Sequence, residues 1–296
     1  MMCVERHAGY GAGLTSADEV DQQLLAAYMQ QLDIDDLSQL ALDETKGALS
    51  GLFLPAASEE YLRSDVRVML VGKEPRSWGR SISHLISSDR STTALRDYVC
   101  AQMQYHRAEA NKRAGRSKFL QFRSRLQASV SATRGKGQGS VAWANLLCVS
   151  LNRRSARFGK TGDRIALLSR KLLKVQLELL APDVVVFGSG YHYDGLIKDL
   201  FDQDYTNLPG IVPKEFWPFE ARGQTIYRVA HPQSHTRKEA QRVLSAVRGY
   251  VNSRRGAGSQ PDAGNGWLQD SLTVTTCPSP VFSYRGGSGY RCDACV

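Results

Sequence analysis

The 296-residue sequence has no apolar run that approaches the roughly 18 residues needed to cross a membrane. Its first residues also lack a basic segment followed by an apolar one, so no secretory signal is expected. With 42% hydrophobic and 23% charged residues, the composition is that of a soluble globular protein. We therefore expect a monomer that resides in the cytoplasm and has no membrane partner.

Cysteine is scarce, and its six positions are scattered at 3, 100, 148, 277, 292 and 295. Only Cys292 and Cys295 have the spacing of a metal-binding pair, and no second pair or nearby histidine completes the four ligands of a zinc site. Without a sign of secretion, free thiols are expected. The sequence thus predicts neither a metal nor a cofactor.

Complete nucleotide-binding motifs are missing as well. Phe158-Gly159-Lys160-Thr161 resembles the end of a P-loop, but Arg154 stands where the first glycine belongs. Gly188-Ser189-Gly190 lacks the remaining glycine of a dinucleotide-binding motif or a nucleophile elbow. Neither segment predicts a phosphate site.

Positive charge is present and unevenly distributed. The net charge is +9, yet residues 1–65 hold 12 acidic and only 3 basic residues. Between Arg107 and Lys136 there are nine basic residues and a single acid, Glu109. Such a concentration favours a polyanionic partner, nucleic acid first, although a solvated basic insertion would give the same composition.

Apolar strands alternate with amphipathic helices along the middle of the chain. The predicted strands include 66–71, 141–151, 182–188 and 225–230, and the predicted helices include 92–128, 163–180, 193–201 and 237–250. The continuous apolar run at 184–187 suits a central parallel strand that is covered on both faces. This alternation predicts an α/β protein, a three-layer αβα fold with a central, mostly parallel sheet.

Three parts are expected in the chain. Residues 1–64 form an acidic helical extension, in which Ser16 and Glu19 make a capping box before a helix. Residues 65–250 form the α/β domain, with a basic insertion at about 105–139. Residues 251–296 are rich in Gly, Ser and Pro without a period, which predicts a disordered tail.

Unusual residues stand where the predicted strands end. Gly72-Lys73-Glu74-Pro75 follows the first strand, Asn145 lies in the second, Gly188 ends another, and His231-Pro232 follows the last. Taken singly, each is better explained by a turn or a satisfied polar group than by a site. Because ligands of open parallel sheets bind beyond the carboxyl ends of the strands, their order favours two halves of one crevice.

This order of motifs resembles the uracil-DNA glycosylase superfamily, which pairs a Gly-x-[Asp/Glu/Asn/Ala]-Pro loop with a distant His-Pro-Ser loop. The segment from Gly72 to Gly79, Gly-Lys-Glu-x-x-x-Trp-Gly, is similar to an uncharacterised bacterial branch. The resemblance covers about residues 65–250. It implies a uracil-DNA glycosylase-like fold and the excision of a base from single- or double-stranded DNA, in repair or in phage defence.

The resemblance also implies roles for individual residues. Glu74 would stabilise the sugar cation or orient a water, and His231 would donate a hydrogen bond to the departing base. Asn145 would read the edge of the extruded base, with Trp78 or Tyr191 stacked on it. The other substrate contacts would be Gly72, Lys73, Pro75, Arg76, Gly188 and Ser234, the last holding a flanking phosphate.

Contacts to the nucleic acid are expected from basic residues and from the loop after His231. They are Arg113, Arg116, Lys118, Arg123, His235, Arg237, Lys238 and Arg242. The sequence departs from the family pattern in three places. Arg76 replaces an aromatic that excludes 5-substituted bases, Gln233 separates His-Pro from Ser234, and His235 replaces an apolar wedge.

Two other functions fit the same residues. One is a nucleic-acid-binding module that has the fold without catalysis, and the other is a hydrolase of free nucleotides or nucleosides. The basic residues serve the binding module equally well, whereas the free-nucleotide enzyme has no need of them.

Overall fold

The computed structural model describes residues 16–43, 49–76, 78–87, 90–112, 115–132, 140–151, 154–158, 161–234 and 236–258. The helices are α1 (Ala17–Gln31), α2 (Ile34–Asp43), α3 (Glu59–Leu62), α4 (Ile82–Ser87), α5 (Thr92–Ala110), α6 (Lys118–Ala132), α7 (Gly162–Leu180), α8 (Asp194–Leu200) and α9 (Arg237–Gly258). The strands are β1 (Val68–Gly72), β2 (Val141–Asn145), β3 (Ser150–Leu151), β4 (Arg154–Ser155), β5 (Val184–Phe187), β6 (Thr206–Asn207), β7 (Phe216–Ala221) and β8 (Gln224–Val229). Two 3-10 turns, η1 (Ala156–Phe158) and η2 (Tyr191–Tyr193), complete these elements.

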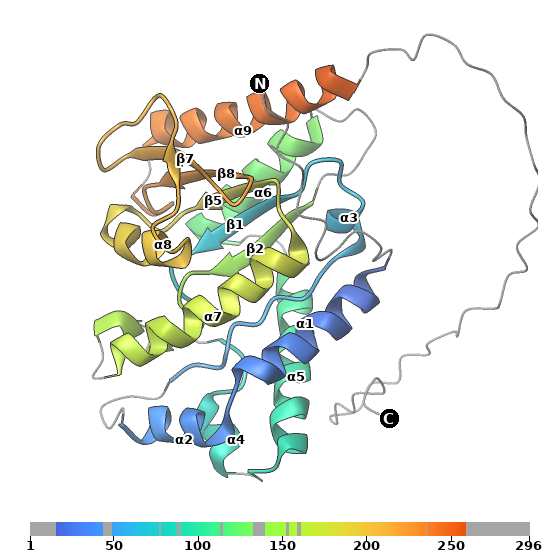
Figure 1. The fold of residues 1–296 in the computed structure, drawn as a ribbon, viewed down its shortest axis with the longest axis vertical. Helices are drawn as coiled ribbons and strands as arrows, with labels where there is room; N and C mark the ends of the chain where they lie inside the picture. Colours follow the sequence, from blue (N-terminus) through green and yellow to red (C-terminus); the bar gives the residue numbers. More distant parts are fainter. Residues whose placement is uncertain are drawn as a thin grey trace, which may run out of the picture.

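Six of the strands form one sheet in the order β2-β1-β5-β8-β7-β6 (Figure 1). β1 pairs in parallel with both β2 and β5, and β5 pairs in parallel with β8. β7 and β6 join antiparallel at the other end. The predicted mostly parallel sheet is confirmed.

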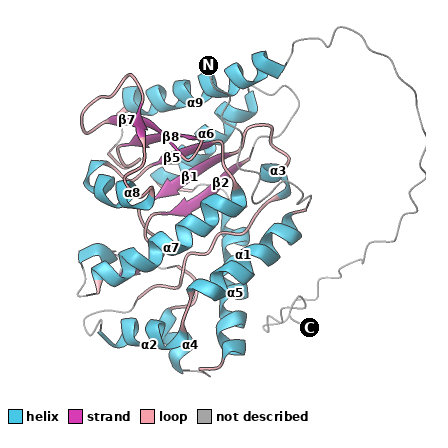
Figure 2. Ribbon diagram, viewed as in Figure 1, coloured by secondary structure: helices cyan, strands magenta, loops and turns pink. Residues whose placement is uncertain are grey.

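Alternate residues of each strand build the two faces of this sheet. Val68 and Leu70 pack with α6 and α9, whereas Met69 and Val71 pack with α1, α7 and α8. Helices therefore cover both faces (Figure 2), which confirms the three layers. The buried face of every strand also explains why the sequence shows continuous apolar runs here.

The helix boundaries differ from the prediction at the C-terminal end. α9 continues to Gly258, so residues 251–258 are helical rather than part of a disordered tail. Val251 is buried one turn beyond Val247, and this packing extends the helix. Residues 1–15 and 259–296 lie outside the described residues. None of the described helices combines the length and the apolar character of a membrane span.

Two predicted appendages belong to the same core as the sheet. The capping box of Ser16 and Glu19 is confirmed, and α1 then buries Leu24 and Tyr28 with α7 and the sheet. The described part of the expected basic insertion, 105–132 without 113–114, forms the end of α5 and the whole of α6. α6 buries Phe122 against the sheet, so this part of the segment belongs to one of the helical layers.

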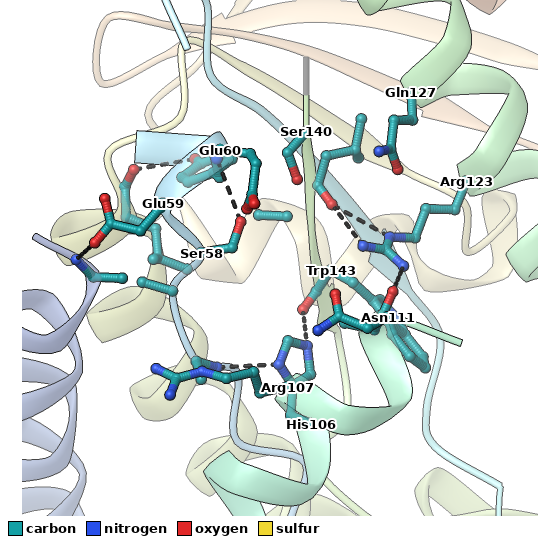
Figure 3. Close-up of a pocket in the computed structure, with 18 of the residues that line it drawn as sticks. Ser58, Glu59, Glu60, His106, Arg107, Asn111, Arg123, Gln127, Ser140 and Trp143 are labelled. Carbon is teal, nitrogen blue, oxygen red and sulfur yellow. Dashed lines mark hydrogen bonds between the residues drawn. The ribbon is translucent and has the colours of Figure 1, made fainter. Parts of the chain in front are cut away.

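Side chains close the free edge of β2. His106 Nε2 lies 3.1 Å from the carbonyl oxygen of Trp143, and Arg123 donates to the carbonyl oxygen of Val141 at 3.2–3.3 Å (Figure 3). The Ala56 N–H donates to His106 Nδ1 at 3.1 Å, which places the ring proton on Nε2. Burial lowers the pKa of His106 to about 3, so the ring is neutral.

This histidine predicts a specific loss of stability in acid. Unfolded, His106 binds a proton below its ordinary pKa of 6.5, whereas the folded protein excludes that proton down to about pH 3. Its contribution is complete above pH 6.5 and falls, as the pH is lowered, by about 1.4 kcal/mol per pH unit. The free energy of unfolding is measured in urea from pH 7 to 4. His106→Gln should remove the contribution of His106 to its pH dependence, whereas the control His84→Gln, on an exposed histidine, should keep that contribution. Equal slopes for the native protein and His106→Gln would contradict the assignment.

Candidate functional site

The carboxyl ends of four neighbouring strands meet at one edge of the sheet. Past the end of β2, the N–H of Leu146 donates to the carbonyl oxygen of Gly72 at 2.9 Å. On the other side of β1, Gly188 N–H donates to Val71 O at 2.8 Å, and Gly190 N–H donates to Val229 O of β8 at 3.0 Å. The strand-end residues predicted as a site are therefore brought together.

Gly72 and Asn145 are direct partners in the pairing of β1 with β2. A Cβ atom on Gly72 would lie 2.4 Å from Asn145 Oδ1 and 3.0 Å from the ring of Phe119 in α6. Glycine is thus required for the close approach of these two side chains. The contact of Phe119 with the site was missed, because nothing in the sequence indicates which face of α6 meets the strand ends.

Asn145 is 6% exposed, and its Nδ2 is buried without a hydrogen-bond partner among the described residues. Ser189 Oγ, just after β5, is also buried without a hydrogen-bond partner among the described residues. Buried polar groups are nearly always hydrogen-bonded in proteins. These two exceptions, at the ends of the strands on either side of β1, indicate groups that are available to a ligand or to ordered water.

Glu74 is half-buried directly after β1, and its Oε2 is likewise buried without a partner in the described part of the chain. Burial raises the pKa of this carboxyl group, while a hydrogen bond from Ser155 and the charges of Lys73 and Arg76 lower it. Ser155 comes from the β3–β4 hairpin, and its Oγ lies 3.1 Å from Tyr193 OH. Ser155 could not be recognised from the sequence, because the pairing of β3 with β4 brings it to Glu74 from 81 residues away.

The rest of this loop differs in exposure. Pro75 is buried, Lys73 is half-buried, and Arg76 is exposed. Burial lowers the pKa of Lys73, whose Nζ lies 6.0 Å from the centre of the Tyr193 ring. Lys73 and Arg76 therefore supply positive charge on both sides of Glu74.

The His231-Pro232 segment forms a tight turn after β8. Ser234 N–H donates to His231 O at 2.7 Å, and Gln233 N–H lies 3.3 Å from His231 Nδ1. A ring that accepts at Nδ1 carries its proton on Nε2 when neutral. A Cβ on Gly188 would lie 3.4 Å from Pro232, so the turn rests on the end of β5. Ser234 is exposed, and His235 is outside the described residues.

The two aromatics predicted to stack on a base differ sharply. Trp78 is only 6% exposed, with its ring 4.4 Å from Phe53 and 5.4 Å from Trp143, so protein covers it. The prediction of stacking on Trp78 is wrong, since its hydrophobic ring is used in the core. Tyr191 is 39% exposed in η2, beside Gly190.

The predicted nucleic-acid contacts divide into three groups. Those that are exposed are Arg116, Lys118, Arg237 and Lys238. Two have partners within the protein: Arg123 holds the edge of β2 and the Ala110 carbonyl, so its predicted role is wrong, and Arg242 pairs with Glu215 at 3.2 Å. Arg113 lies outside the described residues.

A cavity of about 870 Å³ lies beside the start of β2, away from these strand ends (Figure 3). The positively charged side chains that line it already have partners within the protein: Arg123 donates to backbone carbonyls, Arg107 pairs with Asp21, and Lys112 pairs with Glu109. No group of three or more metal-ligating side chains occurs in the part of the chain that the structure describes. The strand-end site is therefore the stronger candidate.

Comparison with known proteins adds no assignment to this geometry. No protein family model matches the chain, and no curated protein matches it.

The close approach at Gly72 predicts opposite effects for two alanine substitutions. Gly72→Ala forces Asn145 and Phe119 to move and should lower the free energy of unfolding by about 1–3 kcal/mol. Gly188→Ala places its methyl group in ordinary contact with Pro232 and should be neutral or stabilising by up to about 1 kcal/mol. Urea unfolding of both variants measures the difference. Equal effects would show that the approach of Gly72 to Asn145 does not require glycine.

Proposed function

We propose that this protein is a DNA glycosylase with a uracil-DNA glycosylase-like fold, which hydrolyses the N-glycosidic bond of a base extruded from DNA. The observation that carries the proposal is the half-buried Glu74 carboxylate, one oxygen of which has no partner among the described residues, at the same sheet edge as Asn145 and His231. A carboxylate, a base-reading amide and a neutral hydrogen-bond donor are the groups that this reaction needs. The arrangement of the motifs along the α/β fold supports the same conclusion.

The reaction breaks the bond between C1′ of the sugar and a ring nitrogen of the base. The bonding electrons leave with the base, so C1′ gains positive charge and the base gains negative charge. In the proposal, Glu74 faces the sugar, stabilises the cation and accepts a proton from the water whose oxygen bonds to C1′. The desolvation that raises its pKa also strengthens its interaction with a developing cation.

His231 acts on the departing base. Its Nδ1 accepts from the Gln233 N–H, so the neutral ring carries its proton on Nε2, and in the proposal this proton is donated to a base oxygen as negative charge develops. The unpartnered Nδ2 of Asn145 would donate to the base edge, with Tyr191 as the accessible aromatic for stacking. Arg76 is exposed and replaces the aromatic that excludes 5-substituted bases in uracil-specific enzymes, so the proposed site admits 5-substituted pyrimidines.

An oligonucleotide cleavage assay tests the proposal. Single- and double-stranded oligonucleotides that carry uracil, hypoxanthine or a bulky modified pyrimidine are incubated with the protein, and abasic sites are cleaved with alkali and counted. With the best substrate, Glu74→Gln should lower the rate roughly 10²–10⁴-fold. His231→Gln should lower it roughly 10²–10³-fold. The control is Glu220→Gln, on an exposed residue that pairs with the start of β8, at the opposite edge of the sheet.

The outcomes separate the alternatives. Salt-dependent binding of DNA without an abasic product from any base would favour the inactive binding module. Hydrolysis of free nucleosides without action on oligonucleotides would favour the nucleoside hydrolase.

The hydrogen bond from Ser155 predicts a shift in the pH profile. Glu74 is active in its deprotonated form, so the rate falls as the pH is lowered through its pKa. Because Ser155 lowers that pKa, Ser155→Ala should raise it and move the acid limb of kcat/KM to higher pH. Ser155→Thr retains the hydroxyl and should keep the native profile. An unchanged acid limb in Ser155→Ala would remove Glu74 as the group that titrates.

A further inference from the structure

A groove of about 620 Å³ runs between α6 and α9. Its floor consists of buried apolar side chains that include Phe122 and Leu244. Its walls carry three exposed cations, Lys118 and Arg125 from α6 and Arg237 from α9. No acidic side chain lines it, so the groove has a single sign of charge.

These three cations have no acidic partner among the described residues, in contrast to other cations of the molecule. On the same helix α9, Arg242 pairs with Glu215 at 3.2 Å. On α7, Lys174 pairs with Asp202 at 2.8 Å. The groove therefore gathers three uncompensated positive charges on one surface, which favours an anionic ligand.

The groove begins at the turn that carries His231. Pro232 and Gln233 line one end of it, directly after the histidine. Pro232 also rests on Gly188, at the end of β5. A chain lying in the groove would thus reach the four strand ends without crossing another part of the protein surface.

The spacing of the cations favours an extended ligand. Lys118 and Arg125 are seven residues apart on α6, so their Cα atoms stand about 10 Å apart along the helix axis. This separation matches successive charges of a polyanion better than it matches one phosphate group. The glutamine amides in the groove, among them Gln121 and Gln233, add neutral donors for oxygen atoms.

We propose that the α6–α9 groove binds the phosphodiester backbone of a single polynucleotide strand, the one that delivers the target nucleotide to the strand-end site. The choice of that strand rests on the proposed function. Lys118, Arg125 and Arg237 each contact a phosphate, and the strand leaves the site past Pro232 in one direction.

A salt titration of binding tests the groove without any catalysis. The probe is a fluorescein-labelled oligomer of twelve tetrahydrofuran abasic units, which carries no base to be excised, and its binding is followed by fluorescence anisotropy from 50 to 300 mM NaCl. In a triple variant with Lys118→Gln, Arg125→Gln and Arg237→Gln, the slope of log K against log salt should be shallower by about 2, since each lost phosphate contact removes about 0.7. At 0.1 M salt this corresponds to an affinity about 100-fold weaker.

The matched control removes three exposed charges elsewhere. It carries glutamine at Arg90, Arg96 and Lys171, none of which pairs with an acid among the described residues. It has the same net charge as the groove variant and should keep the native slope. Thermal unfolding of both variants checks that each is folded.

Equal slopes for the two triple variants, or no binding of the oligomer by the native protein, would overturn the proposal. Equal competition by polyglutamate would also overturn it, because the groove would then be a site for acidic peptides. Inorganic phosphate that displaces the oligomer at equal phosphate concentration would reduce it to a site for a single anion and overturn it too. Failure of the glycosylase chemistry would leave these titrations unchanged, because they measure the binding of phosphates and involve no cleavage.

Discussion

The parallel pairing of β1 with both β2 and β5 is the constraint on which the rest of the molecule depends. It fixes the carboxyl ends of the parallel strands at one edge, and it requires helices on both faces, since every residue of β1 is buried. It also sets Gly72 opposite Asn145, where a side chain in place of glycine would collide with the amide. Register therefore determines both the hydrophobic layers and the position of the polar groups.

The hydrogen bonding of polar groups differs between the two ends of β2. Near its start and along its free edge, Arg123 and His106 satisfy backbone carbonyls. At its carboxyl end, Asn145 Nδ2 is buried without a protein partner, as is the nearby Glu74 Oε2, among the described residues. An unmade hydrogen bond costs about 1–3 kcal/mol, so a fold that tolerates several at one edge gives up stability there. Function at that edge is the physical reason we infer for this cost.

Much of the architecture could be predicted because the apolar runs are unambiguous. The run at 184–187 and the helix that ends at Leu180 were placed closely, and the strand-end motifs followed from them. β7 was missed, since Pro218 lies inside it and interrupts the strand pattern. The exposure of individual side chains was harder to predict than the positions of the strands and helices. Trp78 and Arg123 have side chains typical of ligand contacts, but Trp78 is buried in the core and Arg123 donates to backbone carbonyls. Arg125 and Ser155 gain their proposed roles only from the residues that the fold brings beside them.

The closed edge of β2 bears on how this protein behaves in a crowded solution. An exposed strand edge can template the addition of a strand from another molecule, which leads to aggregation. Here Arg123 and His106 occupy carbonyl groups that an incoming strand would use. At the opposite end of the sheet, β6 is only two residues long and offers a short template. A sheet limited in this way at both margins offers little backbone on which a strand of another molecule could add.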